Sequence, residues 1–230
     1  MKALLILVVL LLGLGVAADR VAVAAAESQV STRLGNSGAL HGPPGVDITG
    51  FPFLTQAVAG RYDDVRISLT AAELGQPAGT RADISLHGVR VPLSSVVSGS
   101  VRTVPVDRIE GTATLSYALL AARLGPGTKL VREGSGLRIT RTVTLLGQSF
   151  PLTAAGTVTL QGRELVVHVQ KAAGAGVQVP GFVLDQAARL LDLRYPVPKL
   201  PFGLVLTSAR PGATGVDVGI AAKNAVLATE

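Results

Sequence analysis

The pattern of apolar and polar positions predicts that the chain begins with a long helix. An unbroken apolar run, Ala3–Ala18, follows Lys2. The segment Asp19–Leu34 continues with helical spacing until Gly35-Asn36-Ser37-Gly38 ends it. Its predicted apolar face consists of Val23, Ala26, Val30 and Leu34, while Arg20, Glu27 and Arg33 lie elsewhere.

This apolar run predicts export. It is shorter than the ~20 residues that span a bilayer and is close to the core of a signal peptide. Val16-Ala17-Ala18 offers a cleavage site before Asp19, and Ala24-Ala25-Ala26 offers another before Glu27. An uncleaved anchor is the competing interpretation, because nothing between Gly15 and Leu34 breaks a helix. We expect residues 1–18 to be a signal peptide or membrane anchor, and 19–230 to be one domain in the periplasm or on the extracytoplasmic face of the plasma membrane.

The stretch Pro43–Gln56 contains two of the five Phe residues of a chain without Trp. Pro44-Gly45 predicts a turn, and Gly50-Phe51-Pro52 predicts a second bend after a short extended piece. Helical spacing then begins at Phe53, and Gly60 ends the helix before a strand. The stripe of this short helix consists of Phe53, Leu54, Ala57 and Val58.

Alternation of apolar and polar residues predicts strands along the rest of the chain. The apolar sets are Val65, Ile67, Leu69 and Ala71; Ala82, Ile84 and Leu86; and Ile109, Gly111, Ala113 and Leu115. Three closely spaced strands are expected over Leu137–Leu146, Phe150–Leu160 and Glu164–Lys171, and a last pair over Gly203–Ala209 and Gly215–Ala222. Arg141 falls on the apolar face of its strand, and Gly88 indicates a bulge or a close backbone approach.

Two more helices are predicted between these strands. Ser116 is the expected N-cap of a helix that Gly125-Pro126-Gly127 ends, and Pro180-Gly181 opens another over Phe182–Leu193. Tyr195–Pro201 is expected to be extended. The order of elements predicts an α+β fold in which a long twisted antiparallel sheet is wrapped around helices.

Composition and charge narrow the range of functions. Aromatic residues make up 3% of the chain and the formal net charge is +6, with Arg residues scattered singly. The scarcity of rings for base stacking argues against nucleic-acid binding. A diffuse positive charge is compatible with an anionic membrane. The chain has no Cys, which excludes disulfides and thiolate chemistry.

The sequence offers no recognisable catalytic or metal-binding constellation. His41, His87 and His168 lie far apart, with no partner at metal-ligand spacing. Asp63-Asp64 is the only pair of adjacent carboxylates in the sequence and is expected to be a solvated turn. The Gly-x-Ser-x-Gly pattern of a nucleophile elbow is missing. We therefore expect a protein that is not an enzyme and uses no metal or cofactor.

The predicted strands and helices each carry one face of small aliphatic residues. Such faces can close into a dense core, or they can line a dry tunnel that accepts acyl chains. Both functions stay open on this pattern. The first is a lipid-binding or lipid-carrying protein, and the alternative is a non-catalytic structural or interaction protein of an envelope complex with a filled core.

Several stretches resemble the LmeA family of actinobacterial phospholipid-binding cell-envelope proteins. They are Thr49–Gln56, Gly60-Arg61-Tyr62-Asp63, Gly88–Leu93, Gly111–Tyr117 and Leu200-Pro201-Phe202-Gly203-Leu204. The resemblance implies an exported, membrane-associated lipid binder and, for one branch of the family, a role in mannolipid maturation in the cell envelope. It also implies similarity to tubular lipid-binding (TULIP) folds, in which a twisted half-barrel sheet wraps a long helix around a lipid groove.

The lipid contacts are nominated from the apolar pattern, because the resemblance fixes no contact positions. They are Phe51, Phe53, Leu54, Val58, Phe182, Val183, Ala187, Leu190 and Leu191. The expected partners are phospholipid, with anionic headgroups favoured, and the membrane surface. The sequence indicates neither a nucleic-acid partner nor a particular protein partner.

Overall fold

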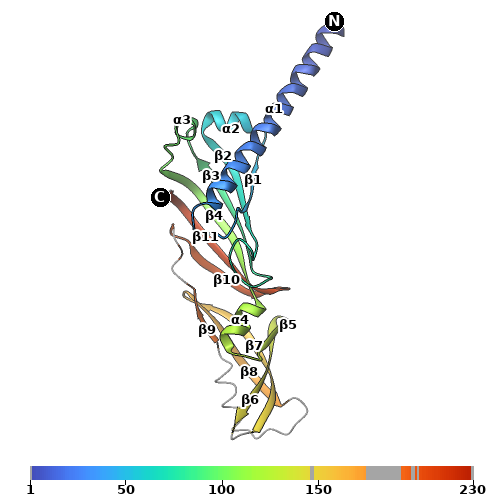
Figure 1. Ribbon diagram of the computed structural model, residues 1–230, viewed down its shortest axis with the longest axis vertical. Helices are drawn as coiled ribbons and strands as arrows, with labels where there is room; N and C mark the ends of the chain where they lie inside the picture. The colour runs from blue at the N-terminus through green and yellow to red at the C-terminus, as the bar shows by residue number, and fades with distance from the viewer. Residues whose placement is uncertain (1, 146–147, 175–192, 198–199, 201, 229–230) are drawn as a thin grey trace. The chain divides into compact units, whose positions relative to one another are not determined.

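The computed structural model in Figure 1 has the predicted α+β class. It describes residues 2–145, 148–174, 193–197, 200 and 202–228. The strands form two antiparallel sheets, of six and five strands, and over the described residues neither closes into a barrel. The sequence predicted one long sheet, so the class is confirmed but the strands are shared between two sheets.

The elements follow in an order close to the predicted one. The helices are α1 (Lys2–Gly35), α2 (Phe53–Ala59), α3 (Leu93–Val97) and α4 (Tyr117–Leu124). The six-stranded sheet has the order β1-β2-β3-β4-β11-β10, with β1 Gly45–Thr49, β2 Arg61–Leu69, β3 Arg81–Arg90, β4 Thr103–Ser116, β10 Val205–Pro211 and β11 Gly215–Ala228. The five-stranded sheet is a meander of β5 Lys129–Glu133, β6 Gly136–Leu145, β7 Gln148–Gln161, β8 Glu164–Gly174 and β9 Leu193–Pro196.

The chain divides into two compact units. Unit 1 consists of Met1–Leu69, Asp83–Glu110 and Ala222–Glu230, and unit 2 consists of Thr70–Ala82 and Gly111–Ala221. Unit 1 holds α1, α2 and α3, and unit 2 holds α4 and the five-stranded sheet. The two units are described separately below.

The core of unit 1 lies where α1 and α2 cover its strands. Its buried apolar side chains include Val23 of α1, Phe53 and Ala57 of α2, and a strand set of Ile48, Val65, Leu86, Val89, Val106 and Ile109. Helix α1 contacts β1 and α2, and α2 contacts α3. Because Phe53 and Ala57 are four residues apart, one face of α2 points into this core.

The docked face of α1 is more polar than predicted. Asp19, Val23, Glu27 and Ser31 recur at every fourth position, which places them along one face. Glu27 accepts a hydrogen bond from the Ile48 amide at 2.8 Å, and Ser31 donates one to the Pro44 carbonyl at 2.5 Å. The prediction that Glu27 lies away from this face is therefore wrong, because its carboxylate satisfies an amide of β1.

Val30 also differs from the prediction. It was assigned to the packed face of α1, but its side chain is 37% exposed. The packed face keeps Val23, which is buried, and the half-buried Ala26 and Leu34. Helix α1 ends at Gly35, as predicted.

Unit 2 has a closed apolar core between α4 and the five-stranded sheet. Ser116 caps α4 by accepting a hydrogen bond from the Leu119 amide at 3.2 Å, as predicted. The largest fully buried side chains of this core include Leu120, Leu137, Ile139, Leu165 and Val167. Arg141 shares the inward parity of Leu137 and Ile139, and its Nη1 donates to the Leu124 carbonyl at the end of α4 at 2.7 Å. Arg141, which the sequence placed on an apolar face, thus caps the C-terminal end of α4 with a hydrogen bond.

Three elements lie outside the sequence-based expectations. Strand β5 and helix α3 were not among the predicted elements. Leu193 begins β9, which pairs with β8, so the predicted helix Phe182–Leu193 does not include its last residue. The rest of that helix lies outside the described residues. Gly88 has a φ of 65°, and a Cβ atom there would collide with the Asp107 carboxylate, which confirms the predicted close approach.

Candidate lipid-binding surface

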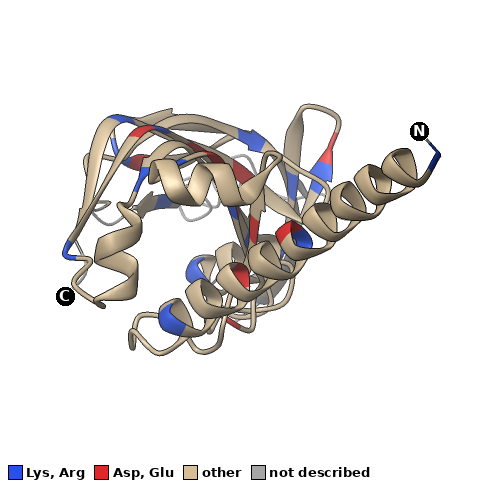
Figure 2. Ribbon diagram, turned by 90° about the horizontal axis from the view of Figure 1, so that it is seen from above, with Lys and Arg blue, Asp and Glu red and all other residues tan. Residues whose placement is uncertain are grey.

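The N-terminal half of α1 presents its apolar side chains to solvent. Leu5, Leu10 and Leu14 are each about two-thirds exposed. Figure 2 shows that this half of the helix carries charge only at its first residues. Of the described helices, α1 is the one that is long and apolar enough to cross a membrane, a property that signal sequences share. The fold itself does not bury this apolar surface.

The boundary between this apolar run and the docked part of α1 is fixed by Asp19. Its carboxylate is buried, and Oδ1 accepts a hydrogen bond from the Leu54 amide at 2.8 Å. Helix α2 has no side-chain cap of its own, because Pro52 occupies the N-cap position. The Leu54 amide, followed by the Phe53 amide and Arg20, holds the pKa of Asp19 below its ordinary value. Asp19 therefore serves as the N-cap of α2 from another helix.

Helix α2 turns a second apolar face outward. Leu54 and Val58 are four residues apart and are 42% and 76% exposed. Phe51, in the bend before α2, is 60% exposed, and the Arg20 guanidinium lies 5.2 Å from the centre of its ring. A short helix that is apolar on both its buried and its exposed face marks an interaction surface.

Helix α3 extends this exposed apolar area. Leu93 and Val97 are 41% and 81% exposed, also at a spacing of four residues. Helix α2 contacts α3 within unit 1, and the two helices lie side by side in Figure 1. We call this set, consisting of Phe51, Leu54, Val58, Leu93 and Val97, the α2–α3 surface.

The stretches that resembled the LmeA family hold this surface in place. The Gln56 side chain accepts a hydrogen bond from the Asp63 amide at 3.0 Å and donates one to the Thr49 carbonyl at 3.5 Å. Gly60 ends α2 with a φ of 66°, and its carbonyl accepts a hydrogen bond from the Val91 amide at 2.9 Å. A Cβ atom at Gly60 would lie 3.0 Å from Pro92, which directly precedes α3. Glycine thus permits both the left-handed cap and the approach of α3.

The structure places the nominated lipid contacts in different environments. Phe51, Leu54 and Val58 are exposed on the α2–α3 surface. Phe53 is buried, with its ring centre 6.0 Å from that of Tyr62. The remaining nominated residues lie outside the described part of the chain: Phe182, Val183, Ala187, Leu190 and Leu191.

Sequence reasoning missed two parts of this site. Leu93 and Val97 were not nominated, although their spacing after Pro92 is the signal of a short helix. Asp19 was considered only as the residue after a cleavage site, and no local pattern links it to α2. Its partner is 35 residues away in sequence.

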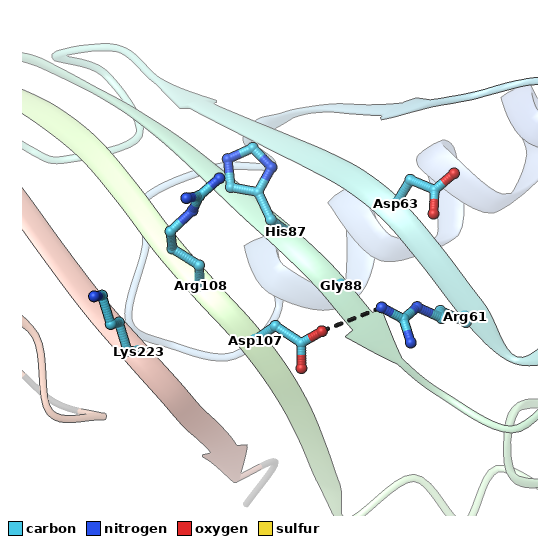
Figure 3. Close-up of a pocket in the computed structure, with 7 residues that line it drawn as sticks. All are labelled: Arg61, Asp63, His87, Gly88, Asp107, Arg108 and Lys223. Carbon is cyan, nitrogen blue, oxygen red and sulfur yellow. Dashed lines mark hydrogen bonds and ion pairs between the residues drawn. The ribbon is translucent and has the colours of Figure 1, made fainter.

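A pocket of about 360 Å³ that is lined by polar side chains and one glycine also lies in unit 1 (Figure 3). It is lined by Arg61, Asp63, His87, Gly88, Asp107, Arg108 and Lys223. Arg61 and Asp107 pair at 3.4 Å, and His87 Nδ1 lies 3.4 Å from Asp64, so Asp64 is not the solvated turn residue that was predicted. Among the described residues, no three His, Cys, Asp or Glu side chains are grouped to hold a metal ion. An acyl chain has no apolar wall to contact in this pocket.

The structure thus defines an α+β protein with exposed apolar side chains on α1, α2 and α3. The chain belongs to the LmeA-like phospholipid-binding family, whose model matches residues 17–221. The match covers all of unit 2 and most of unit 1, and it begins at the end of the apolar run, two residues before Asp19. Neither a curated protein nor a solved structure matches the chain.

Proposed function

We propose that this protein is exported, associates with the membrane, and binds phospholipid there through the α2–α3 surface. The observation that carries the proposal is the hydrogen bond between Asp19 and Leu54. It fastens α2 to α1 at the residue where the apolar run ends. A bilayer that holds the apolar run therefore has its surface close to α2.

The side chains at this level suit a membrane interface. Phe51 and Arg20 lie in cation–π contact, and a guanidinium at the end of an apolar helix can extend to the headgroups while its stem stays in apolar surroundings. Leu54, Val58, Leu93 and Val97 would enter the outer part of the bilayer. Burying each such side chain contributes up to ~1.5–3 kcal/mol, so the α2–α3 surface adds substantially to membrane affinity.

The finer parts of the proposal concern the lipid and the compartment. The formal net charge of +6 favours anionic phospholipid. The apolar run at the start of α1 favours export, with the domain on the extracytoplasmic face of the plasma membrane or in the periplasm. Membership of a phospholipid-binding family supports a non-catalytic role. The cellular function that we propose is support of mannolipid maturation in an actinobacterial envelope, which the resemblance to the LmeA family implies.

Depth measurements in vesicles test this orientation. The chain has no Cys, so a single introduced Cys is the sole labelling site. We expect a spin label or a polarity-sensitive dye at Val58→Cys or Val97→Cys to report an apolar environment when the full chain is bound to vesicles. Both positions are largely exposed, so the label itself should be tolerated.

The control label is placed on β2, at Ser68→Cys. Ser68 is exposed and lies seven residues beyond Arg61 along the strand, a distance of about 23 Å at ~3.3 Å per residue. It should report water whether or not vesicles are present. Labels at Val58 and Val97 that stay as hydrated as the label at Ser68 would contradict the proposed membrane contact.

The closed core of unit 2 favours a second candidate function. Leu120, Ile139 and Leu165 are fully buried between α4 and the five-stranded sheet. A filled core of this kind suits a structural or interaction protein of an envelope complex. Native mass spectrometry of protein purified gently from its host separates the two candidates. Co-purified phospholipid supports the lipid-binding function, and lipid-free protein that takes up none from vesicles supports the second candidate.

A further inference from the structure

A second groove in unit 1 has the composition of an anion-binding site. It has a volume of about 360 Å³ and lies where the chain passes from β3 through α3 into β4. Its lining residues all come from the segment 90–105, and no Asp or Glu is among them. The polar ones are Arg90, Ser95, Ser100, Arg102 and Thr103. We call it the β3–β4 groove.

The two arginines of the groove differ in their partners. Arg90 forms an ion pair with Asp107, and the same carboxylate also pairs with Arg61 at 3.4 Å. One carboxylate is thus shared by two guanidinium groups, which leaves an excess of positive charge beside the groove. Arg102 is exposed and forms no ion pair with any residue that the structure describes. Its guanidinium is therefore available to a ligand.

The chemistry of these groups matches a phosphate. A guanidinium donates two parallel hydrogen bonds to phosphate oxygens, and such charge-assisted bonds are roughly twice as strong as neutral ones. The hydroxyls of Ser95 and Thr103 are further donors in the same groove, whereas the Ser100 hydroxyl is paired with that of Ser98. No carboxylate lines the groove to bind a cation, and its two charged side chains are both positive, so the groove favours anions.

The wall of the groove is ordered by its own hydrogen bonds. The Ser98 amide donates to the Ser94 carbonyl at 3.0 Å, and the Ser100 amide donates to the Ser95 carbonyl at 3.0 Å. The Ser98 and Ser100 hydroxyls lie 2.7 Å apart. These contacts connect α3 to the loop that carries Arg102. The hydroxyl side of the groove is therefore formed before a ligand arrives, which lowers the entropy cost of binding.

Helix α3 joins the groove to the α2–α3 surface. Ser95 lines the groove, while Leu93 and Val97 of the same helix are exposed apolar side chains. On a helix, residue 95 points about 200° away from residue 93, so the two functions occupy different sides of α3. With the apolar side in the outer bilayer, the groove side lies at the depth of the headgroups.

We propose that the β3–β4 groove binds the phosphate of an anionic phospholipid headgroup, with Arg102 as its main ligand. This inference rests on the proposed function, since the bilayer contact of α3 brings the groove to the headgroups. It identifies the phosphate as the part of the lipid that this protein recognises through charge and hydrogen bonds rather than through apolar contact. The source of the phosphate is a membrane lipid, not a free metabolite.

The test uses the full chain in dodecyl maltoside micelles, which contain no phosphate. Phosphatidylglycerol is then added to the micelles, and the Nε–Hε NMR signal of Arg102, assigned by its loss in Arg102→Gln, is followed. We expect this signal to shift with the lipid, and inorganic phosphate at matched ionic strength to shift it much less. An equal shift with inorganic phosphate would overturn the headgroup assignment and show that the groove binds free anions.

Calorimetric titration with the same mixed micelles gives the affinities. We expect Arg102→Gln to weaken phosphatidylglycerol binding about tenfold, because a charge-assisted hydrogen bond pair is lost. Arg102→Lys should lower the affinity for phosphatidylglycerol several-fold although the charge is retained, because an ammonium lacks the planar fork of donors in a guanidinium. Lys223→Gln is the matched control: Lys223 is an exposed cation of the same unit that lines the other pocket, and we expect a change of less than about twofold.

The outcomes separate this inference from the proposed function. Equal affinities of Arg102→Gln and Lys223→Gln overturn the groove assignment. If the labels at Val58 and Val97 are still immersed in vesicles, the membrane function stands without the groove. Hydrated labels contradict the membrane function itself. A salt-insensitive loss in Arg102→Gln with normal melting excludes misfolding and diffuse charge as causes.

Discussion

The Asp19 carboxylate lies 2.8 Å from the Leu54 amide and provides α2 with the cap that its own sequence lacks. The two residues are 35 positions apart, and one belongs to the helix that carries the apolar run. The contact joins the hydrophobic N-terminus of the chain to the first helix of the α2–α3 surface. Its loss should therefore affect both stability and membrane contact.

Replacement of Asp19 tests this contact directly. We expect Asp19→Ala to lower the melting temperature by about 2–4 °C, the size of effect of removing a helix cap in a protein of this length. Asp47→Ala is the matched control, since Asp47 is an exposed carboxylate on β1 in the same unit. Circular dichroism melting of both variants gives the comparison, and equal melting temperatures would show that the cap is dispensable.

The contact also predicts a pH dependence. The pKa of Asp19 is below its ordinary value in the folded protein because the Leu54 amide stabilises the carboxylate. The stabilisation is therefore fully present above the pKa of an unfolded Asp, ~4, and is lost as the pH falls through the lower folded value. The melting difference between wild type and Asp19→Asn should shrink as the pH falls below about 4. A difference that stays constant with pH would contradict the carboxylate's role.

The same residue distinguishes the two candidate cleavage sites. Cleavage before Asp19 keeps the cap of α2, whereas cleavage before Glu27 removes both Asp19 and the buried Val23. We expect the intact mass of protein from its host to correspond to the uncleaved chain or to a chain that begins at Asp19. A mass for a chain that begins at Glu27 would mean that α2 is stable without its cap.

In unit 2, Arg141 is the residue whose replacement should be most informative. Its Nη1 donates to the Leu124 carbonyl at the C-terminus of α4, where a positive charge is favoured by the helix dipole. We expect Arg141→Leu to lower the free energy of unfolding by about 1–2 kcal/mol. The control is Arg138→Leu on the exposed side of β6, where the ion pair with Glu133 contributes little. Chemical denaturation measures both, and equal effects would contradict a special role for Arg141.

The parts of the fold that were predicted well are those whose signals are local. Helix α4 has an N-cap at Ser116, an apolar face, and Gly125-Pro126-Gly127 at its end, and all three lie within a few residues. Strands β6, β7 and β8 follow one another with only a few residues between them, so alternation and turn residues were enough to place them. The resemblance to the LmeA family also rested on short motifs, and the family match confirms it.

The parts that were missed depend on contacts between distant segments. Glu27 looked like a solvent-facing residue because periodicity assigns carboxylates to the outer face, yet it satisfies the Ile48 amide at the edge of the sheet. In the candidate site, Phe51, Leu54 and Val58 were nominated for being apolar, and their exposure could not be read from the pattern. Phe53 is equally apolar and was nominated for the same reason, but it is buried and packs against Tyr62.

The continuity of α1 has a mechanical consequence. The helix runs from Lys2 to Gly35 without a break, and its second half is fastened by Asp19, Glu27 and Ser31. In the anchored form there is no flexible tether between the membrane and unit 1, since a helix rises 1.5 Å per residue with little freedom to bend. Helix α1 would then be a rigid connection that fixes the height and tilt of the α2–α3 surface relative to the membrane. Each encounter with a lipid would then begin in the same orientation.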